Sequence, residues 1–91
     1  MTEVKTGIKD LIARSSLGEG MSWSAFGGHL KGRRIYYQIK VSLLSRISNI
    51  SMGRILEIEA GAPPFASVAE VRAIASAIGL DSAILESMMP R

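Results

Sequence analysis

The stretch from residue 43 to residue 61 carries two short apolar patterns on either side of a polar break. Each pattern has the three- and four-residue spacing of one helical face. Within the break, Asn49 tolerates the left-handed backbone that a tight turn needs, and Ser51 can cap the first amides of a second helix. The pattern predicts helix, turn and helix, with one apolar face formed by Leu43, Leu44 and Ile47 and a second by Ile50, Ile55 and Ile58.

An additional amphipathic helix is predicted near the N-terminus, from Glu3 to Ser15, where apolar residues fall at i, i+4, i+7 and i+8. The breaker-rich segment that follows separates this helix and its linker, residues 1–20, from a domain of residues 21–91. We expect the helix to cover apolar surface or to pair with a copy of itself. Its basic side chains leave a contact with nucleic acid as the alternative.

The next helix is expected to begin after a cap at Ser22 and to continue to about Tyr37. Trp23 and Phe26 have the helical spacing of core anchors. Three glycines weaken this helix relative to alanine, so tertiary packing has to stabilise it, and small residues also permit close helix approach. These glycines are Gly27, Gly28 and Gly32.

Two further helices are expected after the Pro63-Pro64 break, which cannot continue a helix. Ser67 and Glu70 have the spacing of a capping box at the start of the first, and Gly79 fits its C-terminal cap. Asp81 opens the last helix, whose apolar residues have little remaining sequence to cover them. These are Ile84, Leu85, Met88 and Met89.

Composition narrows the possible functions of this chain. A length of 91 residues, with no cysteine and one histidine, indicates one small domain without disulfides, metal or cofactor. It holds no thiol nucleophile, and Glu57 and Glu59 point to different faces of a helix, so we expect no enzyme. Since no run of about 18 apolar residues occurs, we expect a cytoplasmic protein with no membrane partner.

Charge is distributed unevenly along the chain. The net charge is +3, yet the quarter between Lys31 and Arg54 contains six basic residues and no acidic one. A run of charge usually marks only a solvated face. Here it coincides with the predicted helix pair, which favours a polyanionic partner.

Residues from about Leu30 to Leu85 resemble the helix-turn-helix domain of the lambdoid phage repressor and Cro superfamily, the Xre-type family. The resemblance rests on Asn49-Ile50-Ser51 followed by Ile55, Ile58-Glu59 and Gly61, and on the run from Ala75 to Leu80. It implies an all-α, compact five-helix, lambda-repressor-like DNA-binding domain. It also implies a structural brace between Arg34 and Glu59, and a recognition helix, Met52 to Ala60, that enters the major groove of double-stranded DNA.

The resemblance further suggests which residues contact DNA. Residues at the start of the recognition helix would face the base edges, while the preceding helix and the flanking loops would contact phosphates. The expected base-reading residues are Met52, Gly53, Arg54 and Glu57. The expected backbone contacts are Lys31, Arg33, Lys40, Arg46 and Ser51.

Two functions remain open from the sequence. The first is a sequence-specific transcriptional regulator that binds an inverted-repeat operator as a homodimer and regulates its own gene. Its dimer interface would be the apolar surface of the last helix, with the segment Glu3 to Ser15 as a competing or additional interface. The alternative is an antitoxin-like regulator whose main task is to bind another protein.

Overall fold

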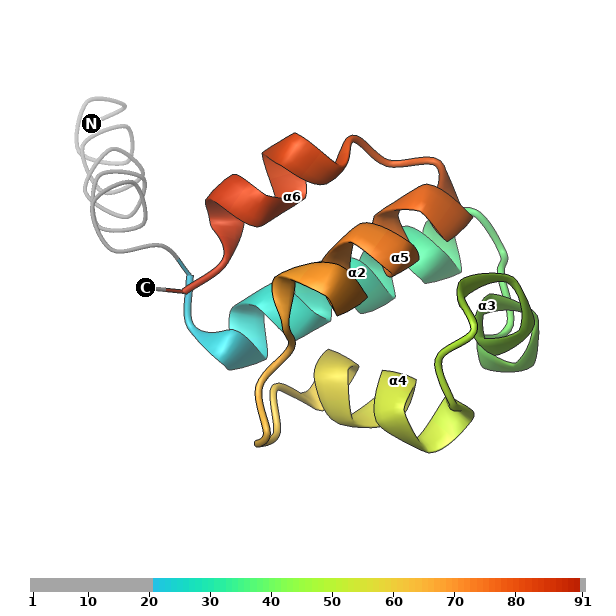
Figure 1. Cartoon of the computed structure of the whole chain (residues 1–91), viewed down its shortest axis with the longest axis horizontal. Coiled ribbons are helices and arrows are strands. Elements are labelled where there is room, and N and C mark those ends of the chain that lie inside the picture. Colours follow the sequence, from blue (N-terminus) through green and yellow to red (C-terminus); the bar gives the residue numbers. More distant parts are fainter. Residues whose placement is uncertain (1–20, 91) are drawn as a thin grey trace, which may run out of the picture.

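The computed structural model of the chain describes residues 21–90 and folds them as five α-helices (Figure 1). No strand occurs among these residues, so the predicted all-α class is confirmed for this part of the chain. The predicted helix from Glu3 to Ser15 lies outside the described residues. The helices are α2 (Trp23–Tyr36), α3 (Val41–Ser48), α4 (Met52–Ala60), α5 (Val68–Ile78) and α6 (Ser82–Met88).

Side-chain caps determine where four of these helices begin, as the sequence predicts. The Oγ of Ser22 accepts a hydrogen bond from the amide of Ala25 (3.0 Å), and Ser51 does the same for Arg54 (3.1 Å). At the start of α5 the complete capping box forms. Each cap satisfies amides that the first turn of a helix leaves free.

Left-handed residues end three of the helices. Asn49 ends α3 with φ 62°, and glycines end α4 and α5 with φ 73° at Gly61 and 89° at Gly79. Asparagine and glycine are the residues that adopt this conformation at the lowest cost. The predicted tight turn between α3 and α4 is thereby confirmed.

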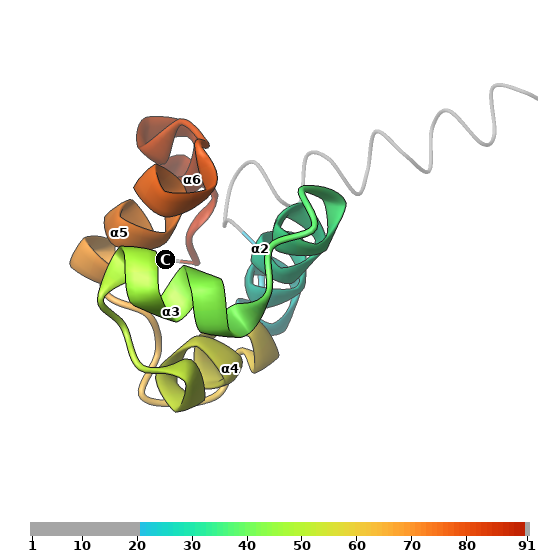
Figure 2. The same cartoon turned by 90° about the vertical axis from the view of Figure 1, so that its right-hand side faces the viewer.

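The helices surround one apolar core. Figures 1 and 2 show α4 and α6 on opposite sides of the molecule, with α2 and α5 between them and α3 across one end. Trp23 packs edge-on against Phe26 and stacks on Phe65, with ring centroids 5.9 and 5.0 Å apart. The buried apolar residues are Phe26, Leu30, Leu44, Ile55, Ile58, Ala66, Val71, Ile74, Ala75, Ile78 and Leu85.

Helices α2 and α4 approach each other closely at one glycine. A Cβ atom on Gly27 would lie 2.5 Å from the carbonyl oxygen of Glu59, closer than real side chains come. The same atom on Gly28 or Gly32 would meet nothing within 4 Å. The expected close approach therefore depends on Gly27 alone among these three residues.

The apolar face predicted for α3 is only partly buried. Leu44 is 1% exposed, whereas Leu43 and Ile47 are 39% and 55% exposed. Leu43 and Ile47 lie about 40° apart around the helix, so they share an outer edge that α4 and α5 do not cover. The helix contacts its neighbours through a narrower face than the spacing suggests.

The domain itself covers one side of α6. Leu85 is 2% exposed, and Met88 and Met89 pack against the core, while Ile84 is 61% exposed. The prediction that little of the domain covers these four residues is therefore wrong for Leu85, and Met88 and Met89 are partly buried. The reason is that α6 folds back along α5, to which Glu86 is tied by hydrogen bonds from Arg72. No helix in the described part of the chain is long and apolar enough to cross a membrane.

Candidate nucleic-acid interface

A buried ion pair braces α4 against α2. The Nε and Nη2 atoms of Arg34 donate to the two carboxylate oxygens of Glu59, at 2.7 and 3.1 Å. A third donor, Nη1, bonds to the carbonyl oxygen of Ile39 at 2.8 Å. Because Arg34 and Glu59 are only 8% and 7% exposed, these groups are structural, as the resemblance implies, and Arg34 is unavailable to DNA.

The turn between α3 and α4 has its own polar network. The Oγ of Ser48 donates to the carbonyl oxygen of Leu44 (2.6 Å) and accepts from the amide of Ile50 (3.3 Å). Together with the left-handed Asn49 and the Ser51 cap, these bonds set the direction in which α4 leaves the turn. Ser51 is exposed there, and its hydroxyl proton remains able to donate to an anion.

Arg54 lies at the surface, but all of its nitrogen atoms donate to groups of the same chain, so the structure does not present it to DNA as the base-reading residue that was predicted. Its Nε and Nη2 donate to both carboxylate oxygens of Glu70, at 2.7 and 2.9 Å. The Nη atoms also reach the carbonyl oxygens of Pro64 (2.7 Å) and Phe65 (3.3 Å) and the carboxylate of Glu57 (3.2 Å). With its side chain 18% exposed, Arg54 ties α4 to the loop and to the start of α5.

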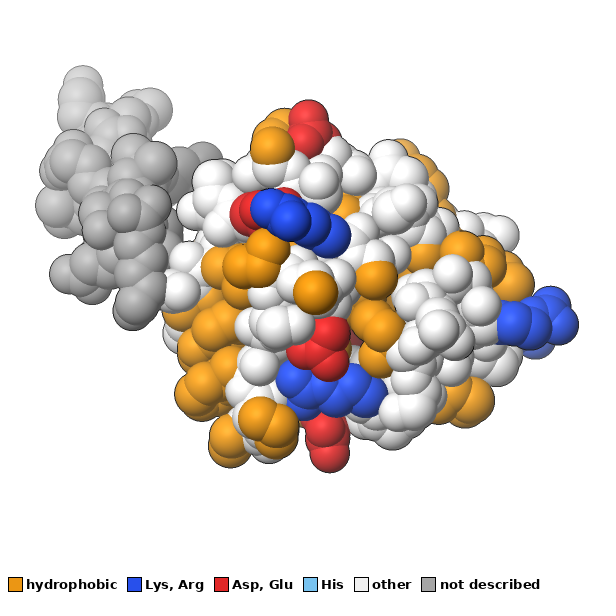
Figure 3. Space-filling model, viewed as in Figure 1, with side chains coloured by type: hydrophobic (Ala, Val, Ile, Leu, Met, Phe, Trp, Pro, Cys, Tyr) orange, Lys and Arg blue, Asp and Glu red, His pale blue; other side chains and the backbone are white. Residues whose placement is uncertain are grey.

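Electrostatics reinforce this attachment. Hydrogen bonding from Arg54 lowers the pKa of Glu70 to about 2, from an ordinary value of 4.5. The carboxylate in turn raises the pKa of Arg54, chiefly through the same hydrogen bonds. Figure 3 shows basic and acidic side chains in contact below the centre of the molecule, on the face that α4 and α5 share.

We expect Arg54→Ala to lower the free energy of unfolding at pH 7 by about 1–2 kcal/mol, since charged hydrogen bonds are lost. A carboxylate with a lowered folded-state pKa stabilises the protein above its unfolded pKa. That stability disappears as the pH falls from 4.5 towards 2, so the variant should lose less stability than wild type over this range. Urea unfolding followed by circular dichroism at several pH values measures both effects.

The matched control is Arg72→Ala, which removes an arginine from the exposed pair with Glu86. Because the Arg72 side chain is 64% exposed, its removal should cost less stability than removal of Arg54. Equal losses from the two substitutions would show that Arg54 is not an internal brace.

The outward face of α4 is mainly apolar. Met52 and Leu56 are 48% and 53% exposed, and the side chain of Glu57 is 53% exposed even though it accepts from Arg54. Leu56 was missed by the sequence prediction, although its position four residues after Met52 places it on the same face. The exposed residues of the helix are Met52, Gly53, Leu56, Glu57 and Ala60.

Four basic residues form no ion pair with any residue from 21 to 90: Lys31, Arg33, Lys40 and Arg46. Lys40 is the residue just before α3, and Arg46 lies in the last turn of α3, the helix that precedes α4. Figure 3 shows basic side chains projecting at the end of the molecule that α3 forms. Lys31 is exposed on α2. The predicted backbone contacts therefore remain available, in contrast to Arg34 and Arg54.

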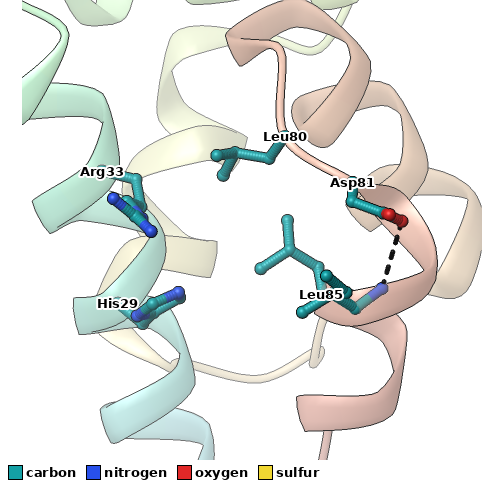
Figure 4. A pocket seen from close by; sticks show the side chains of 6 residues that line it. His29, Arg33, Leu80, Asp81 and Leu85 are labelled. Atoms are coloured by element: carbon teal, nitrogen blue, oxygen red, sulfur yellow. Dashed lines mark hydrogen bonds between the residues drawn. The ribbon is translucent and has the colours of Figure 1, made fainter.

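Arg33 is separated from this surface. It lies about 120° around α2 from Gly27, which is the point where α4 packs. Figure 4 shows Arg33 and His29 on one wall of a cleft of about 170 Å³, facing Leu80 and Leu85. The structure thus does not bring Arg33 together with α3 and α4 in one interface.

Asp81, on the opposite wall of the cleft, already has a structural role. Its Oδ1 accepts hydrogen bonds from the amides of Ala83 (2.9 Å) and Ile84 (3.4 Å) and so caps α6. In the part of the chain that the structure describes, no three His, Cys, Asp or Glu residues are grouped so as to hold a metal ion.

Comparison with known proteins does not provide a family for this chain. No protein-family model matches the sequence, and no curated protein is significantly similar to it. Its function therefore has to be argued from the geometry of α3, the turn and α4.

Proposed function

We propose that this protein is a sequence-specific, double-stranded DNA-binding transcriptional regulator with a lambda-repressor-like arrangement of its five helices. The observation that carries the proposal is the α3–turn–α4 unit, in which α4 is braced from behind by Arg34 and Glu59 and leaves one face exposed. A braced helix with a free face can enter the major groove, which is about 12 Å wide.

The charge around α4 supports a nucleic-acid partner. Lys40 caps α3 without a side-chain hydrogen bond, so the first amides of α3 are available to a phosphate. Arg46 on the same helix and the Ser51 hydroxyl at the start of α4 add donors on both sides of the turn. These groups would position the protein on the DNA backbone, while α4 would supply the sequence preference.

Two copies would act together on an inverted repeat, because one recognition helix of nine residues contacts too few base pairs to be selective. Self-association would use Ile84, which is the large apolar residue of α6 that is exposed, or the segment Glu3 to Ser15. A regulator of this kind would act at the promoter of its own gene. Sedimentation of the protein with DNA should show two protomers per duplex, and a monomer at all concentrations would contradict the dimer.

The test is a titration of labelled DNA from the region upstream of the gene, by fluorescence anisotropy at two salt concentrations. We expect wild type to bind this region more tightly than a scrambled duplex. Lys40→Ala and Arg46→Ala should each weaken binding to both duplexes. Each should also make the negative slope of the logarithm of the binding constant against log salt shallower by about 2, because one phosphate contact is lost in each protomer.

Arg72→Ala serves as the control, because it removes the same charge from a site on α5 that pairs with α6. Its salt slope should remain close to that of wild type. If Arg72→Ala matched Lys40→Ala and Arg46→Ala, only general charge would matter, and an interface centred on α3 and α4 would be wrong.

A second candidate, a regulator that mainly binds another protein, is favoured by one feature of α2. Ile35, Tyr36 and Tyr37 are adjacent at its end and 55%, 73% and 47% exposed. Grouped exposed apolar side chains are typical of protein interfaces. Co-purification with the product of a neighbouring gene, lost in Tyr36→Ser but not in Lys40→Ala, would favour this candidate.

A further inference from the structure

The exposed face of α4 offers DNA no hydrogen-bond donor from its side chains. Met52, Leu56 and Ala60 end in apolar groups, Gly53 has no side chain, and Glu57 carries a carboxylate that can only accept when ionised. The single arginine of the helix uses its guanidinium for Glu57, Glu70 and two loop carbonyl oxygens. This composition restricts what the helix can recognise.

The major groove presents three kinds of group to such a helix. The N7 and O6 atoms of guanine, N7 of adenine and O4 of thymine are acceptors and need donors from the protein. The amino groups of cytosine and adenine are donors, and the thymine methyl is apolar. A face without donors can meet only the second and third kinds.

Gly53 indicates how closely this face can approach its ligand. A Cβ atom there would meet nothing within 4 Å, so the fold does not need a glycine at this position. Glycine inside a helix costs up to about 1 kcal/mol relative to alanine. A glycine that the interior does not require, next to exposed Met52, leaves room for DNA against the first turn of α4.

We propose that α4 selects its DNA site mainly through thymine methyl groups, which Met52 and Leu56 contact, with Glu57 accepting from a cytosine or adenine amino group. This inference rests on the proposed DNA-binding function and names the chemistry that it recognises. Specificity then comes from burial of methyl groups, and Arg54 acts as a positioning residue that holds α4 against the start of α5.

The test uses wild-type protein and a duplex enriched from a random-sequence pool. Each thymine of the site is replaced in turn by deoxyuridine, which lacks only the methyl group. At contacted positions we expect about fourfold weaker binding per methyl. Deoxyuridine in the flanking sequence is the control, and 7-deazaguanine within the site, which removes an acceptor, should leave affinity unchanged.

The variants Met52→Ala and Leu56→Ala test whether these two side chains contact the methyl groups. Both side chains are about half exposed, so the variants should fold, and each should reduce the difference between thymine and deoxyuridine at one position. The inference would be overturned if deoxyuridine bound as tightly as thymine at every position, or if 7-deazaguanine lowered the affinity. Either result would leave DNA binding itself intact. Failure to enrich any duplex would overturn the proposed function as well.

Discussion

Arg34→Ala should lower the free energy of unfolding by about 3–5 kcal/mol, the largest loss that we expect from a single substitution of a charged residue in this domain. Glu59 is only 7% exposed, and the change leaves its carboxylate without a partner. It also removes the hydrogen bond from Arg34 to the carbonyl oxygen of Ile39. A buried charge without a partner is far more costly than a missing pair. Urea unfolding at pH 7 measures the loss.

The double variant Arg34→Met, Glu59→Leu is the matched control, because it removes both charges and retains side-chain volume. We expect it to be more stable than Arg34→Ala, since apolar replacements for a buried pair are often neutral. A loss below about 1 kcal/mol in Arg34→Ala would instead be typical of an exposed pair and would contradict the brace.

Gly27→Ala should destabilise the protein by about 3 kcal/mol, because its new methyl group would occupy the space of the α4 backbone. The Cβ atom would lie 2.5 Å from the Glu59 carbonyl oxygen, and backbone cannot move aside as a flexible side chain can. To relieve the overlap, α2 and α4 would have to separate, which would also disturb the ion pair between Arg34 and Glu59.

The neighbouring glycine offers a control of opposite sign. Gly28→Ala adds a methyl group with nothing within 4 Å, and alanine favours the helix by up to about 1 kcal/mol. Thermal and urea unfolding should therefore show that Gly28→Ala is more stable than wild type and that Gly27→Ala is much less stable. Similar stabilities for the two variants would mean that α2 and α4 do not meet at Gly27.

Local features of the fold were predictable because they depend on neighbouring residues. The caps at Ser22, Ser51 and Ser67 need only a side-chain oxygen and an amide three residues further on. The turn at Asn49 likewise needs one residue that accepts a left-handed backbone. Helix positions along this chain follow from such short-range chemistry.

The side-chain partner of Arg54 was not predictable in the same way. Glu70 lies 16 residues away, and the spacing with Ser67 already assigned it to a capping box. The structure shows that this one carboxylate accepts from the Ser67 amide in the cap and also from Arg54. Which charges pair and which remain free depends on how helices are placed, and the sequence pattern does not contain that information.

The environment of α6 shows the same limit. An apolar stripe near the end of a chain can cover its own domain or a second copy, and both give the same periodicity. Here Leu85, Met88 and Met89 turn inwards and Ile84 turns outwards. The direction of the link around Gly79 and Asp81 decides between these outcomes, and only the structure gives that direction.

The central claim is that the exposed face of α4 contacts double-stranded DNA, and amide chemical-shift mapping tests it most directly. Labelled protein would be titrated with the enriched duplex and, separately, with its scrambled version. We predict that the largest shifts specific to the enriched duplex fall on the turn and on α4 from Ser51 to Glu57, with smaller ones near Lys40 and Arg46. Shifts confined to the cleft beside His29 and Arg33, or the same shifts with both duplexes, would contradict the claim.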